Sequence, residues 1–242
     1  MFVDSLKRRI LTLLLLFGIG ACANAEILTA GVGELPLYAQ TQKHQIFVNF
    51  LNALSIESGI TIETINLPFA RSLQLVKRRQ IDFHLPMIQA PYASGRQTDY
   101  DYSTETLFYV NFVLYDNRQK PVDIKRLHDY IIETDFAHKE YFDFDIHPSS
   151  CIECSAKKLN AGRIDGLIYA DLAIDPLIRK FELKNIQRRF YKRYHAKIIL
   201  PKGERGGSMD RFLTEHITTL RNSGKLKAIF SDIDRPYDDW QP

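Results

Sequence analysis

Apolar and polar positions along the chain alternate between two periods, one typical of strands and one typical of helices. Residues 27–32 form a short apolar run that ends in Gly33, which is typical of a buried strand. Residues 44–58 carry their apolar side chains on one helical stripe, and Gly59 follows where a helix commonly ends. The N-terminal part of this pattern therefore predicts a strand followed by a helix.

The same criteria predict further elements along the chain. We expect strands at 60–65, 81–85, 107–115, 130–133, 164–169 and 198–200. We expect helices at 70–79, 123–129, 155–161, 172–181 and 209–222, and a polar, acidic loop at 138–150. Strands that alternate with helices predict an α/β fold with mainly parallel sheets flanked by helices.

Composition supports a globular protein and argues against a general nucleic-acid binder. The 242 residues are 45% hydrophobic and 25% charged, which suits one large or two small domains. The formal net charge is +3, and the first 25 residues supply +2 of it through Lys7, Arg8, Arg9 and Asp4. The rest of the chain lacks the basic excess that binding to many phosphates requires.

The first 25 residues have the pattern of an export signal. Three basic residues precede the apolar run 10–20, and Ala23-Asn24-Ala25 forms a small-x-small cleavage site. The run is too short to span a membrane. We expect cleavage after Ala25 and a periplasmic protein; the alternative is a lipobox at Ile19–Cys22 that would leave a lipidated Cys22 as the N-terminus.

Cleavage after Ala25 leaves two cysteines, Cys151 and Cys154, in a C-x-x-C spacing. In an oxidising compartment this pair is consistent with a local disulfide or with free thiols. A zinc site would need two more ligands, and His147 is the one candidate close in sequence. We therefore expect neither a metal site nor redox chemistry here, and no cofactor.

Six blocks follow one another along the chain in a characteristic order: Glu26–Tyr38, Ile46–Gly59, Pro68–Asp82, Arg96 with Ser103 seven residues later, Leu159–Asp165 and Leu220–Ile229. One Gly-x-x-Asp turn lies within LNAGRID, and Arg79 replaces the Gly of an earlier turn of this kind. Together the six blocks resemble the type 2 periplasmic solute-binding proteins, specifically family 3, the polar amino-acid binders of ABC transporters.

The resemblance implies two α/β lobes joined by two hinge strands, with a ligand enclosed between them by hinge closure. Residues 1–25 would be the signal peptide. Lobe one would comprise residues 26–115 and 203–242, and lobe two residues 116–202. The change in sequence texture after Tyr115 and again at Pro201-Lys202-Gly203 agrees with these boundaries.

A small zwitterionic ligand needs a cation, an anion and apolar walls. By the resemblance, Arg96 would bind the carboxylate of the ligand, since guanidinium forms two parallel hydrogen bonds. Arg71 would supply a second cation or be a solvated arginine at the start of a helix. Asp171 would bind the ammonium, although the aspartate of the family falls one residue earlier, and it could instead cap the following helix.

Several neighbouring residues complete the predicted site. Tyr38 and Tyr92 are candidate aromatic walls, and Gln89 and Ser94 are candidate hydrogen-bonding residues. Glu34 and His84 are loosely placed acid or base candidates, and His84 fits a core histidine better. The basic segment 184–197 fits a solvated face of lobe two, with a permease-docking face or a lipid contact as alternatives. The nearby acids Glu133, Asp135, Glu140, Asp143 and Asp145 are expected to balance its charge.

The sequence thus predicts a monomeric periplasmic protein that captures a small polar solute, an amino acid or related carboxylate, and delivers it to the permease of an ABC transporter. One alternative is a sensory module of the same fold that reports to a membrane receptor or kinase. The other is an enzyme resembling the periplasmic dehydratases, which would need a buried acid or base of shifted pKa beside the ligand.

Overall fold

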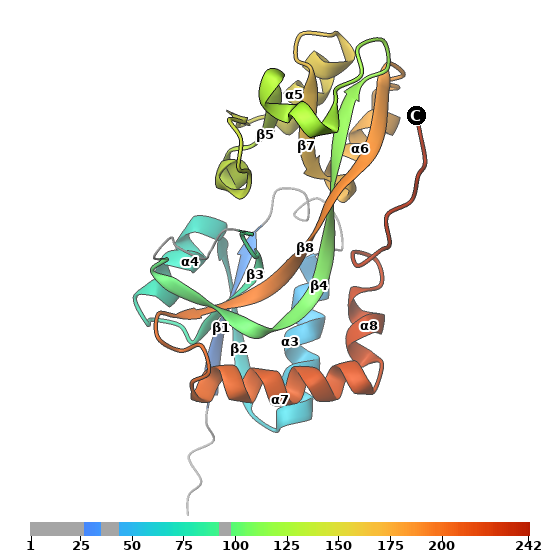
Figure 1. Cartoon of the computed structure of the whole chain (residues 1–242). Coiled ribbons are helices and arrows are strands. Elements are labelled where there is room, and N and C mark those ends of the chain that lie inside the picture. The colour runs from blue at the N-terminus through green and yellow to red at the C-terminus, as the bar shows by residue number, and fades with distance from the viewer. Residues whose placement is uncertain (1–26, 35–43, 92–97) are drawn as a thin grey trace, which may run out of the picture.

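The computed structural model describes residues 27–34, 44–91 and 98–242. Eight strands form one mixed sheet in the order β2-β1-β3-β8-β4-β7-β5-β6 (Figure 1). The strands are β1 (Ile27–Glu34), β2 (Thr61–Pro68), β3 (Phe83–Ile88), β4 (Tyr100–Asn117), β5 (Ile132–Asp135), β6 (His147–Ser149), β7 (Gly166–Ala170) and β8 (Ile186–Pro201).

Helices flank both ends of this sheet. The α-helices are α3 (His44–Ser58), α4 (Phe69–Lys77), α5 (Ile152–Asn160), α6 (Asp171–Lys180), α7 (Ser208–Asn222) and α8 (Lys225–Phe230), and the 3-10 helices are η1 (Ile124–Asp129) and η2 (Phe136–Tyr141). The predicted helix at 44–58 therefore has the bounds of α3.

The sheet divides into two halves that share the long strands β4 and β8. Parallel pairs join β1 to β2 and β3 in the first half, and β5 to β6 and β7 in the second. β8 pairs antiparallel with β3 and with β4, and β4 pairs antiparallel with β7. Figure 1 shows β4 and β8 passing from the half that holds α3, α4, α7 and α8 into the half that holds α5 and α6. The expected fold class, a two-lobe α/β arrangement, is confirmed.

Three elements differ from the sequence prediction. β8 spans Ile186–Pro201, whereas the pattern predicted only 198–200, because its many cations hid the strand period. β4 begins at Tyr100, before the apolar run that was expected to start it. The region expected to be a loop at 138–150 contains most of η2 and the whole of β6.

A buried apolar core lies in each half. In the first half Phe47 and Phe50 of α3 pack near Phe230 of α8, with ring centroids 6.4 and 5.6 Å apart. In the second half Val113 and Tyr115 of β4 belong to a separate cluster with residues of α5 and α6. The larger cluster continues from the first half into the second through Ile132 of β5 and Ile168 of β7, and β4 contributes to both clusters.

The two turns that resemble Gly-x-x-Asp share an unusual backbone conformation. Gly162 has φ +68°, which glycine adopts without strain. Arg79 has φ +55° at the matching position of the first half, although an L side chain disfavours this region. The Arg79 guanidinium donates to Glu204 Oε1 (2.9 Å) and to the carbonyl of Lys202 (2.7 Å). The turn geometry is thus retained where the glycine is replaced.

The predicted lobe boundaries at Tyr115 and Lys202 stay a prediction. The β3–β8 pairing includes Lys197 and Ile199, and the β4–β7 pairing runs from Phe112 to Asp116. The segment following α8 contacts the second half, as described below.

Candidate functional site

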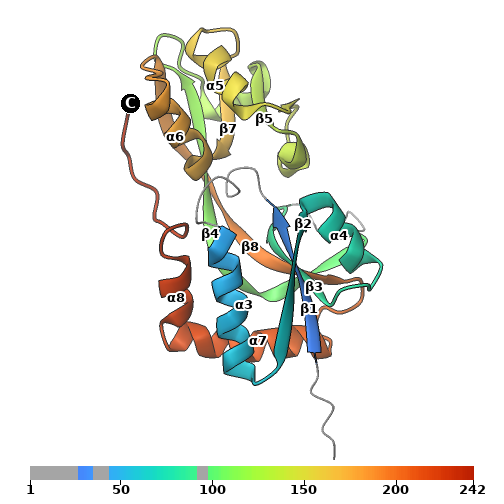
Figure 2. The ribbon, with the colours of Figure 1, turned by 180° about the vertical axis from the view of Figure 1, so that it is seen from behind.

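The strands of the two halves end opposite one another. β1 and β3 end at Glu34 and Ile88, and β5 and β7 end at Asp135 and Ala170. In Figures 1 and 2 the arrowheads of β1 and β7 point toward the opposite half. Ligands of open α/β sheets bind outside the carboxyl ends of strands. The candidate functional site is therefore the interlobe region, meaning the residues at these four strand ends.

A hydrogen bond already joins the halves at this place. The hydroxyl of Tyr141, in η2, donates to the carbonyl of Ile88 at the end of β3 (2.7 Å). Tyr141 is buried, and its burial raises the pKa of the phenol well above its usual value. The neutral phenol is therefore a stable donor, and it fixes η2 against the end of β3.

Two more tyrosines surround the same backbone segment from β4. The hydroxyl of Tyr102 lies 3.4 Å from the Ile88 carbonyl and 3.4 Å from the Ala90 N–H. The hydroxyl of Tyr100 lies 3.4 Å from that of Tyr102. Burial raises the pKa of Tyr102 to about 12. No sequence motif predicts this tyrosine cluster, because its members come from β4 and η2 and meet only in the folded chain.

A carboxylate–imidazole pair, Asp135 at the end of β5 and His138 in η2, lies beside these rings. Asp135 Oδ1 lies 3.2 Å from His138 Nδ1 and accepts the Ala137 N–H (2.9 Å). Burial alone would raise the pKa of Asp135, but these two hydrogen bonds outweigh it and hold the pKa below its usual value. The His138 ring packs edge-on against Tyr141, with centroids 4.9 Å apart. The carboxylate thus orients an imidazole at the interlobe region.

Asp171 is the first residue of α6, directly after β7, and not its N-cap, which is Ala170. Its Oδ2 accepts from the Asn111 amide of β4 (3.0 Å), and its Oδ1 accepts the Leu172 N–H (2.7 Å). Burial raises the pKa of Asp171 against the effect of these bonds. The carboxylate is therefore held in place at the end of a strand in the second half.

The other predicted site residues divide into two groups. Arg71 is exposed on α4, and Gln89 is half-buried one residue after β3, where its N–H donates to the His195 carbonyl (2.7 Å). Four predicted residues, Tyr38, Tyr92, Ser94 and Arg96, lie outside the described residues. The signal segment and Cys22 lie outside them as well.

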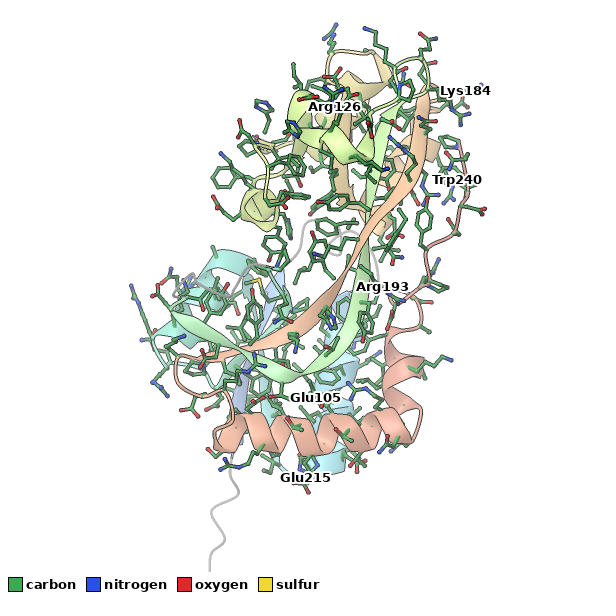
Figure 3. The ribbon with its side chains drawn as sticks, viewed as in Figure 1. Glu105, Arg126, Lys184, Arg193, Glu215 and Trp240 are labelled. Atoms are coloured by element: carbon green, nitrogen blue, oxygen red, sulfur yellow. A yellow bond between two sulfur atoms is a disulfide. The ribbon has the colours of Figure 1, made fainter. Side chains whose placement is uncertain are left out.

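The prediction of a solvated basic face at 184–197 holds for only part of the segment. Lys184, Lys192 and Arg193 are exposed, whereas Arg188 and Lys197 are buried. These residues belong to a turn and to strand β8, on which Figure 3 labels Lys184 and Arg193. Arg188 pairs with Asp175 and Asp238, Arg189 with Asp116, and Arg193 with Asp234, while Lys197 is buried against the carbonyls of Ser103 and Thr104. The expected balancing acids differ as well, because Glu133 pairs with Lys158 and Asp135 with His138.

His84 is a core histidine, as expected. Its Nδ1 lies 2.7 Å from the Ser72 hydroxyl oxygen, and both side chains are fully buried between α4 and β1. Burial lowers the pKa of His84 to about 4. This neutral, buried imidazole packs inside the first half, and its Nε2 atom has no hydrogen-bond partner among the described residues.

Cys151 and Cys154 form a disulfide, with Cα atoms 5.2 Å apart. Cys151 is the N-cap of α5, where its sulfur accepts the Cys154 N–H (3.2 Å). Only Ser150 separates the pair from strand β6, which lies in a segment expected to be a loop. The disulfide therefore closes the first turn of α5.

The described residues contain neither a metal-ion cluster nor a membrane-spanning helix. In residues 27–34, 44–91 and 98–242, no cluster of three or more His, Cys, Asp or Glu side chains has an arrangement suited to a metal ion. Within the same residues, the helices are too short or too polar to cross a membrane.

No family model matches the sequence, and no curated protein matches it. Solved structures match its fold. The GluR0 ligand-binding core from Nostoc punctiforme, in complex with L-glutamate, is 11% identical, covers 86% of this chain and 100% of its own, and has a TM-score of 0.63. The arginine-, lysine-, histidine-binding protein ArtJ from Geobacillus stearothermophilus is 16% identical over 86% and 95%, with a TM-score of 0.61. A histidine kinase sensor domain with similarity to periplasmic binding proteins is 18% identical over 86% and 95%, with a TM-score of 0.63.

Proposed function

We propose, from its likeness to the fold of the type 2 periplasmic solute-binding proteins, that this chain is a non-enzymatic periplasmic protein. It captures a small polar solute and presents this solute to the permease of an ABC transporter. The observation that carries the proposal is the opposition of strand ends from two halves joined by β4 and β8. Two such halves enclose a ligand by rotating about the shared strands. The solute we propose is an amino acid or a related carboxylate.

The proposed chemistry uses one cation and one anion. Arg96 binds the carboxylate of the ligand through two parallel hydrogen bonds, and Arg71 supplies a second cation from α4. Asp171 faces the ammonium from the second half, supported by Asn111 and by the Leu172 N–H. Tyr38 and Tyr92 serve as walls, and Gln89 and Ser94 add hydrogen bonds. The chain needs no cofactor for this task and acts as a monomer.

A thermal-shift screen of residues 26–242 tests the proposal. The panel contains amino acids, polyamines, dicarboxylates and small peptides. A ligand at a hundred times its dissociation constant stabilises the folded protein by about 2.7 kcal/mol, which is easily measured. We expect a hit among the carboxylates, and we expect Arg96→Ala to abolish it.

The matched control for the two arginines is Arg78→Ala, since Arg78 is an exposed arginine at the C-cap of α4. This variant should bind as tightly as the parent chain. Unchanged affinity in Arg96→Ala would remove Arg96 from the site. Absence of any hit across the panel would contradict the proposed solute class.

A second candidate is a sensor that reports a ligand to a membrane kinase. It is favoured by the similarity to a histidine kinase sensor domain, whose TM-score of 0.63 equals that of the GluR0 core. Neighbouring genes discriminate the two roles. A permease and an ATPase beside this gene support delivery to a transporter, and a membrane sensor supports signalling.

Enzymatic turnover is the outcome that would change the class of the protein. In the proposed binding site Asp171 binds the ammonium of the ligand, and the buried His84 takes no part. Incubation of the purified chain with cyclic carboxylic acids should leave them unchanged. Formation of a dehydrated product would identify a dehydratase in place of a binding protein.

Export is tested by the mass of the protein recovered from the periplasm. Cleavage after Ala25 gives a mature chain that begins at Glu26. A chain that begins at a lipidated Cys22 would show instead that the protein is anchored to a membrane.

A further inference from the structure

The segment that follows α8 also passes from the first half to the second. Figures 1 and 2 show it leaving α8 and running along the second half beside α6. Its start is fixed in the first half, because the N–H groups of Ile233 and Asp234 donate to the Phe230 carbonyl (2.9 and 2.7 Å). We call residues 234–242 the tail.

The tail first contacts the middle of the two shared strands. Asp234 Oδ1 accepts from the Arg193 guanidinium of β8 (2.5 Å). The Arg235 carbonyl accepts from the Asn111 amide of β4 (3.0 Å). These contacts lie where β4 and β8 cross between the halves, so the tail is held at the hinge itself.

The tail is then held to the second half around Arg188. The Gln241 side chain accepts the Arg188 N–H (2.9 Å) and donates to the Arg188 carbonyl (2.9 Å), as a neighbouring strand would. The Arg188 guanidinium donates to the Trp240 carbonyl and to Asp238 Oδ1 (3.2 Å). Arg118 donates to the Pro242 carbonyl.

Aromatic packing adds to these polar contacts. The Arg179 guanidinium lies 3.9 Å from the centroid of the Trp240 ring, and Tyr237 packs on Phe190 with centroids 5.4 Å apart. Tyr237 and Trp240 both pack against the buried core of the second half. The tail is therefore built into the second half although it comes from the first.

Arg188 is well suited to hold the tail because it is itself fixed. Its side chain is 1% exposed, and it donates to Asp175 Oδ2 (2.7 Å), while Asp175 Oδ1 accepts from the Tyr115 hydroxyl (2.8 Å). A buried guanidinium with this many partners does not reorient freely. The tail is thus anchored on a rigid group.

The contacts of the tail, rather than its length, oppose a change in the angle between the halves. Asp234 and Gln241 are seven residues apart, while their partners Arg193 and Arg188 on β8 are five apart. At roughly 3.3 Å per extended residue the tail can reach about 23 Å, whereas β8 covers at most about 17 Å between the same points. The tail is therefore not taut, and what opposes a change of angle is the set of hydrogen bonds and ring contacts that hold it to both halves.

We propose that residues 234–242 are a strap that restricts the angle between the two halves, anchored by Asp238, Trp240 and Gln241 on Arg188. In both figures the tail lies on the side of β4 and β8 opposite to η2, so rotation of η2 toward or away from α4 changes the distance that the tail must span. Release of the strap widens the range of interlobe angles.

The strap also adjoins the proposed ligand site. Asn111 donates to Asp171 Oδ2 and to the Arg235 carbonyl, both at 3.0 Å, so one amide joins the end of β7 to the tail. A ligand that binds Asp171 would alter this shared donor and so affect the strap. This coupling rests on the proposed function, whereas the strap itself does not.

The experiment needs no ligand and uses residues 26–242. Spin labels are attached at Gln74→Cys in α4 and Lys139→Cys in η2, two exposed positions on elements that face each other in Figure 1. The native Cys151 and Cys154 are joined in a disulfide and do not take the label. Pulsed dipolar spectroscopy then gives the distribution of interlobe distances.

The strap is released by Asp238→Ala with Gln241→Ala, and the matched control is Asp239→Ala. The Asp239 side chain is exposed and makes no hydrogen bond or ion pair with the described residues. Trp240 is the single tryptophan of the chain, so its fluorescence reports the state of the tail. We expect the released variant to shift Trp240 emission to longer wavelength and to broaden the distance distribution, and the control to match the parent.

Two results would overturn the proposal. A red-shifted Trp240 with an unchanged distance distribution would show that the tail detaches without freeing the halves. An unshifted Trp240 in the double variant would show that Asp238 and Gln241 do not hold the tail. Neither result bears on ligand binding, so failure of the strap is distinguishable from failure of the proposed function.

Discussion

Single residues with unusual backbone or burial make the sharpest local predictions. Gly162 and Arg79 occupy matching turns with positive φ, and His84 and Ser72 form a polar pair inside the first half. In each case one atom or one dihedral angle fixes what the position tolerates.

At Gly162 the left-handed backbone should resist an added Cβ. Gly162→Ala is expected to lower the free energy of unfolding by about 1 kcal/mol because φ is +68°, while the nearest atom to the added Cβ, Asn117 Nδ2, lies at an ordinary contact distance of 4.0 Å. Gly162→Asn is the control, because Asn tolerates this region better than Ala. Chemical denaturation measures both variants, and equal stability of the glycine and alanine proteins would contradict the backbone assignment.

His84 should make stability depend on pH. Its pKa of about 4 in the folded chain lies below the usual value of 6.5, so the unfolded chain binds the proton more tightly. The contribution of His84 to the free energy of unfolding is therefore fully present above pH 6.5. It is lost as the pH falls from 6.5 toward 4, and the loss from this group reaches about 3 kcal/mol.

His84→Asn separates this effect from the carboxylates, because its amide can keep the hydrogen bond to Ser72 without titrating. Denaturation between pH 7 and 4 should show a shallower loss of stability in the variant. Parallel profiles for the two proteins would show that His84 is not the neutral buried group described here.

At the scale of elements, a strand and a helix pack closely where glycines leave room, and the predicted order of strands and helices does not show these contacts. Strand β1 packs against α4 through two glycines. A Cβ at Gly31 would lie 2.2 Å from Ser72 Oγ, and one at Gly33 would lie 2.7 Å from the Phe69 ring. The glycines of β1 thus allow α4 to lie on the strand and the Ser72–His84 pair to fit between them.

Gly31→Ala should therefore be costly although the strand itself would accept alanine. The new Cβ also falls 2.6 Å from Ile81 Cδ1, so two neighbours would have to move. We expect the free energy of unfolding to fall by roughly 1–3 kcal/mol. The midpoint of urea unfolding measures the loss, and an unchanged midpoint would show that α4 does not pack on β1 at this distance.

On the scale of the whole molecule, Arg188 joins the two halves through the tail while it neutralises a buried acid. Burial tends to lower the pKa of Arg188, but the neighbouring Asp175 raises it, so the guanidinium stays charged. The Arg188 guanidinium therefore pairs with Asp175 in the second half and also donates to Asp238 and Trp240 of the strap.

Arg188→Met should destabilise the chain by about 3–5 kcal/mol, because it leaves the Asp175 carboxylate buried without its cation. Arg188→Met with Asp175→Asn removes the uncompensated charge and should recover part of the loss. Calorimetric unfolding compares the three proteins. A double variant as unstable as the single one would show that the charge of Asp175 is not the cause.

Much of the architecture follows from the sequence alone. Hydrophobic periodicity and the glycine after the last apolar position predicted α3 with its observed bounds. The same local features predicted a strand or helix close to most of the other observed elements. The ordered motifs predicted the two-lobe fold, which the solved structures share. The α/β order and the export signal pattern needed no tertiary information to be predicted.

The tertiary structure alone decided which charges meet. Segment 184–197 looked like a solvated face because its cations are close in sequence, but in strand β8 alternate side chains point to opposite sides and find separate partners. The tyrosine cluster at Ile88 and the Gln241–Arg188 contact join residues that are 14 to 53 positions apart. Local patterns determine the elements, whereas contacts between distant elements exist only once the sheet has brought them together.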